Sequence, residues 1–179
     1  GILWALRVIR RFESEPDEDF VRRNYFKCAL ALGDALLIAF KKYTTQYYGR
    51  DILVRDLAHS EPRVASLDLQ QLYDQALKFK FRPDSVSQKP ITEKMLLDVA
   101  RKWGQVFLLV ETVRCDTKFG SLDEYIDWSG IREKDQHALK PMFRNFIKNV
   151  GLGRLSFRYP RETLYRELPV LLGLVKKSP

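Results

Sequence analysis

The sequence predicts an all-α protein, a helical bundle built around one long apolar helix at about residues 19–43. Three observations lead to this prediction. Residues 20–43 are apolar almost all round, which is typical of a helix enclosed by other helices. Several further segments repeat apolar residues at helical spacing, and no segment alternates with period two for long enough to require a sheet. At 179 residues and 45% hydrophobic composition, the chain can bury a core without a disulfide or a structural metal.

The remaining helices are expected from apolar spacing and from residues that cap helices. Residues 2–12 predict a short amphipathic helix, and a break at residues 13–17 allows Asp17 or Asp19 to cap the long helix. Thr92 is expected to cap a second long helix. Pro141 must lie in the first turns of its helix or kink it. The expected helices after the long one cover residues 51–58, 67–81, 92–114, 122–128, 134–149 and 160–174.

The chain is expected to form a single domain over residues 1–179, with residues 140–179 as an alternative basic helical extension. It begins at Gly1 inside an apolar pattern and without an initiator Met, so we expect a fragment of a longer protein. Neither a signal peptide nor a membrane span is predicted. Cys28 and Cys115 lie in apolar helical segments, and two buried free thiols favour a reducing, cytoplasmic compartment.

Positive charge is concentrated in the last quarter of the chain. The net charge is +8, of which residues 140–179 carry +7. A basic region of this kind predicts an acidic partner, with nucleic acid as the first candidate, and the alternative is an ordinary solvated helical face. The candidate nucleic-acid-binding residues are Lys140, Arg144, Lys148, Arg154, Arg158 and Arg161.

Polar residues inside the long helix form the most informative pattern. Asn24, Lys27 and Asp34 follow the spacing i, i+3 and i+10, so they are expected to share one face. Because an unpaired buried carboxylate costs several kcal/mol, Asp34 should bind an Arg, a Lys, a Tyr hydroxyl or backbone amides of another helix. Gly33 lowers helix propensity and predicts that another backbone packs closely there. The face either clamps helices together or lines a pocket for a polar ligand or a neighbouring domain.

Aromatic and basic residues alternate directly after the long helix, at Tyr43, Tyr47, Tyr48 and Arg50. Such residues can stack on bases and hold phosphates. They can equally cap a bundle, with their hydroxyls reaching water.

Catalytic and cofactor patterns are sparse. Arg132 and His137 have the R-x4-H spacing of a ribonuclease-like pair, and Arg55 and His59 have R-x3-H, although such spacings arise easily by chance with 31 basic residues. The two Cys and two His have no zinc-site spacing, and no Gly-rich phosphate loop is present. The sequence therefore implies no cofactor and no metal.

The segment 23–38 (RNYFKCALALGDALLI), followed by the Tyr-rich residues 43–50, resembles the helical domain found C-terminal to nucleotidyltransferase domains. That group includes the C-terminal bundle of kanamycin nucleotidyltransferase and the HEPN domains. Residues 103–114 and 159–169 fit a helical continuation, so the resemblance covers about half of the chain. It implies an up-and-down bundle that positions a substrate for an adjacent nucleotidyl-transfer site.

The catalytic pattern of that group is not carried over. Its Gly-Ser and paired metal-binding acids have only a compact counterpart at residues 120–127, which are predicted to be helical. The HEPN ribonuclease motif fits Arg132 and His137, with Glu133 as the polar residue after the Arg.

Three functions remain open from the sequence. The leading one is a non-catalytic substrate-binding or interaction module of a larger nucleotidyltransferase-like protein. The second is an RNA-binding protein, or a HEPN-type ribonuclease, that uses the basic C-terminal region. The third is a structural scaffold, which requires Asn24, Lys27 and Asp34 to pair only with one another and with their neighbours.

Overall fold

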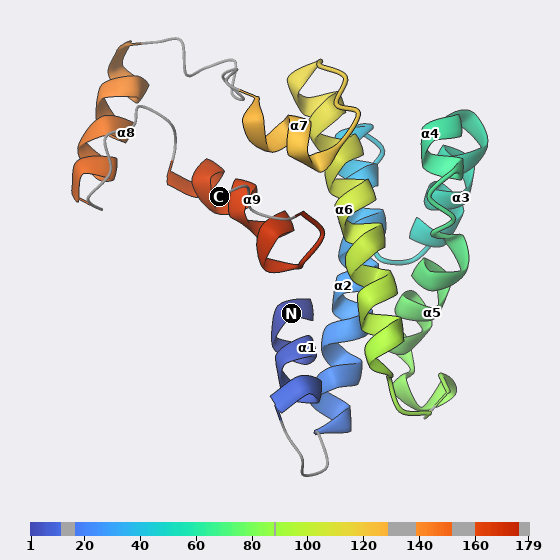
Figure 1. Cartoon of the computed structure of the whole chain (residues 1–179). Helices are drawn as coiled ribbons and strands as arrows, with labels where there is room; N and C mark the ends of the chain where they lie inside the picture. Colours follow the sequence, from blue (N-terminus) through green and yellow to red (C-terminus); the bar gives the residue numbers. More distant parts are fainter. Residues whose placement is uncertain (12–16, 88, 129–138, 152–159, 176–179) are drawn as a thin grey trace. The chain divides into compact units, whose positions relative to one another are not determined.

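The computed structural model describes residues 1–11, 17–87, 89–128, 139–151 and 160–175 (Figure 1). All regular secondary structure in these ranges is helical, which confirms the predicted all-α class. Contacts divide the chain into two compact units, residues 1–113 and 114–179. None of the helices within the described ranges is long and apolar enough to cross a membrane.

Helix α2 (Glu18–Ala39) is the long helix that the sequence predicts. Asp17 caps it, with its side chain accepting a hydrogen bond from the backbone N–H of Phe20 at 2.9 Å. The predicted end at residue 43 is wrong by four residues, because Lys41 adopts a left-handed conformation with φ of 59°. The N–H of Lys42 then donates to the carbonyl of Leu37 at 2.7 Å, which closes the helix in a Schellman-type turn without the usual glycine.

Three helices pack against α2. Helix α1 (Ile2–Arg11) runs antiparallel beside it, and α3 (Arg50–Ser60) and α5 (Gln70–Phe81) pack against other parts of its surface (Figure 1). α2 buries residues on nearly all sides, which explains its continuous apolar sequence. The buried apolar side chains among the described residues of these four helices are Ile2, Ala5, Leu6, Val21, Tyr25, Phe26, Ala29, Leu32, Leu36, Leu37, Val54, Leu57, Tyr73, Ala76 and Leu77.

The connection between α3 and α5 differs from the sequence prediction. A short helix, α4 (Pro62–Ala65), follows α3 and was not expected, and the predicted helix at 67–81 begins only at Gln70. Asp68 has a φ of 48°, which interrupts any helix through residue 68. After α5 comes the 3₁₀ turn η1 (Pro83–Ser85).

Helix α6 (Glu93–Cys115) matches the predicted second long helix, and Thr92 caps it by accepting from the N–H of Met95 at 3.3 Å. Apolar residues at helical spacing form one side of α6. Of these, Leu96, Val99 and Val106 are buried, and Trp103, Phe107 and Val110 are half-buried. Lys102 donates to the carbonyls of Leu67 and Asp68 at 2.8 and 2.9 Å, so α6 is tied to the link between α4 and α5.

The second unit contains α7 (Leu122–Asp127), α8 (Leu139–Gly151) and α9 (Pro160–Leu171). Tyr125 is fully buried and its ring meets the ring of Phe119 edge to face at 5.3 Å. Pro141 lies in the first turn of α8, as predicted. The predicted helical residues 134–138 lie outside the described residues.

Candidate functional site

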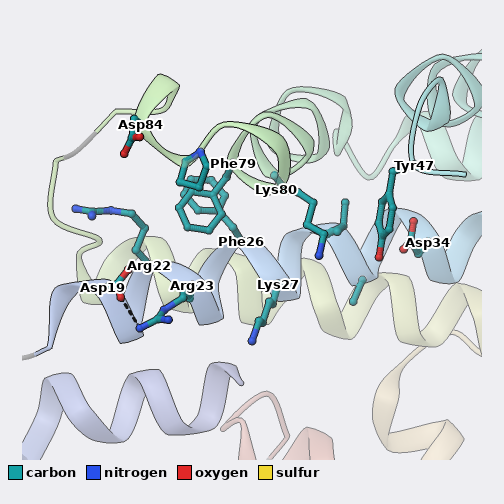
Figure 2. Close-up of a pocket in the computed structure, with 14 residues that line it drawn as sticks. Asp19, Arg22, Arg23, Phe26, Lys27, Asp34, Tyr47, Phe79, Lys80 and Asp84 are labelled. Carbon is teal, nitrogen blue, oxygen red and sulfur yellow. Dashed lines mark ion pairs between the residues drawn. The ribbon is translucent and has the colours of Figure 1, made fainter.

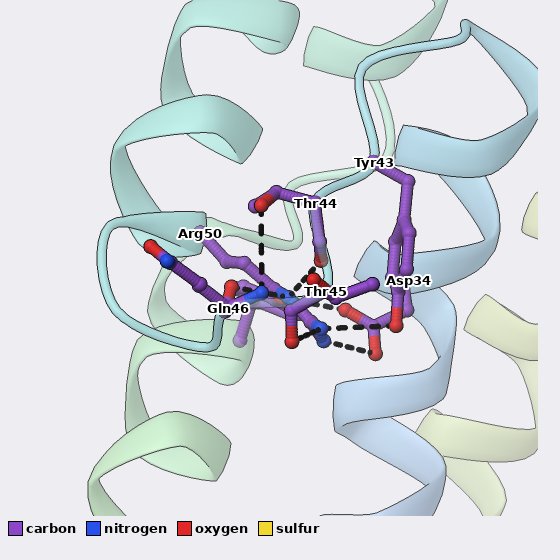
Figure 3. Close-up of polar contacts among 7 residues, drawn as sticks. Asp34, Tyr43, Thr44, Thr45, Gln46 and Arg50 are labelled. Atoms are coloured by element: carbon purple, nitrogen blue, oxygen red, sulfur yellow. Dashed lines mark hydrogen bonds and ion pairs between the residues drawn. The ribbon is translucent and has the colours of Figure 1, made fainter.

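Arg50 lies at the start of α3 and organises the connection between α2 and α3 (Figure 3). Its side chain is 1% exposed, and its Nη1 donates to Oδ2 of Asp34 at 2.9 Å. The rest of the guanidinium donates to the backbone carbonyls of Thr44, Thr45 and Gln46 at 3.0 Å and to the Tyr43 hydroxyl at 2.9 Å. A buried cation needs this full set of acceptors, since burial removes the water that would otherwise solvate it.

Asp34 also has a second partner, on α5. The hydroxyl of Tyr73 donates to Oδ1 of Asp34 at 2.7 Å, so both carboxylate oxygens accept a hydrogen bond. This confirms the prediction that Asp34 binds an Arg or a Tyr hydroxyl. Gly33 makes the contact possible, because a Cβ at this position would lie 2.3 Å from Cδ2 of Tyr73. The close neighbour of Gly33 is thus a ring, and not the backbone that the sequence predicted.

The network raises the pKa values of Arg50 and Tyr73. Burial is the largest single influence on Arg50 and acts to lower its pKa, but Asp34, Tyr43 and Tyr73 together outweigh it and the pKa is raised. The pKa of Tyr73 is raised well above its ordinary value, first by burial and then by its hydrogen bond to Asp34. At neutral pH Arg50 is therefore a guanidinium and Tyr73 a neutral phenol.

The rings of Tyr43 and Tyr47, two of the tyrosines after α2, lie against the guanidinium of Arg50. The guanidinium carbon of Arg50 lies 4.4 Å from the ring centroid of Tyr43 and 4.1 Å from that of Tyr47. Tyr48, in contrast, is 91% exposed. Tyr43, Tyr47 and Arg50 therefore stabilise the turn after α2, and the Tyr43 hydroxyl accepts from Arg50, where the sequence interpretation expected it to reach water.

A pocket of about 600 Å³ lies between α2, α5 and η1 (Figure 2). Its volume falls within the range of small-molecule sites, ~300–1,000 Å³. Phe26 and Phe79 stack in its lining with centroids 4.5 Å apart and planes 22° apart. Tyr47 lies at one end near Asp34, and Asp84 lies at the opposite end. The residues that line it are Asp19, Arg22, Arg23, Phe26, Lys27, Leu30, Ala31, Asp34, Tyr47, Ala76, Phe79, Lys80, Pro83 and Asp84.

The structure brings together only some of the predicted site residues. Lys27, Asp34 and Tyr47 all line the pocket, which confirms that the first two share a face of α2. Asn24 does not line it, and its side-chain amide donates to the carbonyl of Phe20 in the same helix at 2.9 Å. Asn24 and Asp34 thus each have hydrogen-bond partners within the fold, as the scaffold hypothesis requires of these two residues. Lys27 is exposed and has no partner among the residues that the structure describes.

Sequence reasoning missed Lys80, Phe79 and Tyr73, which α5 contributes. Lys80 Nζ lies 5.3 Å from the ring centroid of Tyr47, so an amine from α5 joins the same end of the pocket. The i, i+3 apolar spacing of α5 assigned Tyr73 to a buried side, but nothing in the sequence paired this residue with Asp34. That pairing spans 39 residues and depends on how α5 crosses α2.

The C-terminal candidates are described only in part. Arg144 and Lys148 are exposed and one turn apart on α8. Lys140 and Arg161 lie within α8 and α9, but their side chains lie outside the described part of the chain. Four further candidates lie entirely outside the described residues: Arg132, His137, Arg154 and Arg158.

Neither Cys28 nor Cys115 forms a disulfide, as predicted, and both are half-buried where full burial was expected. Burial raises the pKa of the Cys28 thiol to about 11. Among the described residues, no group of three or more His, Cys, Asp or Glu side chains could hold a metal ion.

Comparison with known proteins finds no matching family model, no significantly similar curated protein and no significantly similar solved structure. The resemblance to nucleotidyltransferase-associated helical domains therefore stays a prediction from the sequence patterns of residues 23–50, 103–114 and 159–169.

Proposed function

We propose that this chain is a non-catalytic helical binding module, and that the pocket between α2 and α5 holds its substrate or partner. One observation carries the proposal. The pocket has the volume of a small-molecule site, an apolar lining and a few polar side chains, including Lys27 and Lys80. A purely structural bundle needs the Asp34–Arg50 network, but it does not need an amine without an ion-pair partner beside an open apolar surface.

The resemblance to nucleotidyltransferase-associated domains supplies the context for this proposal. Such a module would position a substrate for an adjacent nucleotidyl-transfer domain of a larger protein, without contributing reacting groups. We therefore expect the isolated chain to transfer no nucleotide. The measurement is incubation of purified chain with a labelled nucleoside triphosphate and Mg²⁺, and detectable transfer would exclude a non-catalytic role.

Binding at the pocket can be tested by filling it. Ala31 lines the pocket and is exposed, so Ala31→Trp should occupy the space without entering the core. Ala65 is exposed on α4 and does not line the pocket, so Ala65→Trp is the matched control. With the neutral fluorophore N-phenyl-1-naphthylamine as probe, Ala31→Trp should abolish the fluorescence gain and Ala65→Trp should retain it. Equal binding by both variants would show that the pocket is not the binding site.

RNA binding through the basic C-terminal region is the second candidate, favoured by the exposure of Arg144 and Lys148 on one side of α8. Each phosphate contact to single-stranded RNA contributes ~0.7 to the slope of log K against log salt. The double variant Arg144→Gln/Lys148→Gln should therefore reduce the slope by ~1.4. Binding that is insensitive to salt would contradict this function, and a HEPN-type ribonuclease would additionally require His137→Ala to abolish cleavage.

A further inference from the structure

The charges that line the pocket are not equally available to a ligand. Arg23 forms an ion pair with Asp19, and Arg22 lies 3.6 Å from Glu18. Asp34 is held by Arg50 and Tyr73, whose hydrogen bonds occupy both of its oxygens. The negative charge of Asp34 is therefore largely balanced by the buried guanidinium of Arg50.

Two lysines that line the pocket take no part in these ion pairs. Neither Lys27 nor Lys80 has an ion-pair partner within the described residues, and both side chains are exposed. Lys80 lies against the ring of Tyr47, with Nζ 5.3 Å from the ring centroid, and Lys27 lies on α2 between Arg23 and Asp34 (Figure 2). Asp84, the remaining acid in the lining, lies at the far end from Tyr47. Lys27 and Lys80 are therefore the cations of the pocket that an anionic group could bind without displacing an ion-pair partner within the described residues.

The surface between the two ends is apolar. Phe79, Leu30 and Ala31 expose it, whereas Phe26, which stacks on Phe79, and Ala76 line it as buried residues. Contact with this surface would be favourable for an apolar group, because burial removes apolar area from water. An inorganic anion would leave the surface bare, whereas a long nucleic acid strand would not fit a pocket of about 600 Å³.

We infer that the pocket selects a small amphiphilic anion, in which a phosphate, sulfonate or carboxylate is attached to a compact apolar or aromatic body. This inference rests on the proposed binding function and names the ligand class of the same pocket. The anionic group would accept charge-assisted hydrogen bonds from Lys27 and Lys80, and the apolar body would lie over Phe26 and Phe79. A neutral ligand would gain only the second contact.

A pair of fluorophores with the same ring system separates the two contributions. The probes are 8-anilinonaphthalene-1-sulfonate and N-phenyl-1-naphthylamine, which differ by the sulfonate. We expect the sulfonate to bind at least about 10-fold more tightly, as one charge-assisted hydrogen bond beyond the apolar contact would give. In Lys27→Gln/Lys80→Gln this preference should fall to about 3-fold or less. Displacement by 1-naphthyl phosphate and by 1-naphthoate then distinguishes a phosphate-bearing from a carboxylate-bearing ligand, with 1-naphthol as the uncharged competitor.

Lys78→Gln/Lys94→Gln is the matched control, since it removes the same charge from exposed lysines that do not line this pocket. It should keep the anionic preference. Equal binding of the two fluorophores to the wild type would overturn the inference but leave the proposed binding function standing. Loss of the preference in the control variant would also overturn it, because net charge would then explain the result. If neither fluorophore binds in a manner that Ala31→Trp blocks, the proposed function itself fails.

Discussion

Two polar residues on the same face of α2 have opposite surroundings. Asp34 is enclosed by Arg50 and Tyr73 and has a hydrogen bond on each oxygen, whereas Lys27, two turns earlier, reaches the pocket without an ion-pair partner in the described structure. The difference follows from burial. A carboxylate among apolar helices is tolerated only when it is fully paired, but a lysine at the edge keeps its amine in water. One face of one helix thus carries both a structural clamp and a candidate binding group.

The largest loss of stability is expected when Arg50, the cation that pairs with Asp34, is replaced. Arg50→Met leaves Oδ2 of Asp34 and three backbone carbonyls without the Arg50 donor, and should lower the free energy of unfolding by about 3 kcal/mol. Arg63→Met is the control, because Arg63 pairs with Glu61 at an exposed site and its loss should cost less than about 1 kcal/mol. Urea denaturation measures both. Equal costs would mean that the enclosed network stabilises the fold no more than a surface pair does.

Gly33→Ala should have the next largest effect. The added methyl would overlap the buried ring of Tyr73, and overpacking of this kind costs about 2 kcal/mol even after the gain in helix propensity. Gly151→Ala places a methyl where no atom lies within 4 Å, so it should be neutral or slightly stabilising. Thermal unfolding of the two variants compares them, and a stabilised Gly33→Ala would show that Tyr73 does not pack against α2 in this way.

Tyr73→Phe removes one of the two partners of Asp34 and should cost about 1.5 kcal/mol, since Arg50 still pairs with the carboxylate. The pKa of Tyr73 is raised in the fold, so its contribution is complete below the ordinary value of 10.0 and declines as the pH rises above it. The stability difference between wild type and variant should therefore shrink above pH 10. A difference that grows with pH would contradict a neutral phenol donating to Asp34.

Lys27→Gln should have the smallest effect on stability. An exposed amine without an ion-pair partner contributes little to folding, so the free energy of unfolding should change by less than about 0.5 kcal/mol. Chemical denaturation at low and high salt makes the measurement. A decrease in the free energy of unfolding of more than about 1 kcal/mol would show that Lys27, like Asp34, stabilises the fold.

The beginnings of the helices could be predicted better than their ends. Asp17 and Thr92 cap α2 and α6 as expected, because a capping side chain acts within three residues of sequence. The end of α2 was misplaced because Lys41 takes a left-handed conformation that sequence patterns assign to glycine or asparagine. Asp68, also left-handed, caused the exception among the beginnings, because the helix predicted from residue 67 starts only at Gln70.

By itself, the sequence determined that the protein is helical, that a long helix at about residues 19–43, observed at 18–39, is enclosed, and that Asp34 must have a partner, because these follow from local periodicity and from the cost of burying a charge. Only the tertiary structure decided which partners Asp34 takes and that Lys27 and Lys80 line one pocket. Arg50 and Tyr73 reach Asp34 from α3 and α5, and α5 also contributes Lys80 to the pocket. Such contacts depend on how helices cross, and the crossing is set by the packing of side chains such as Tyr73 against Gly33.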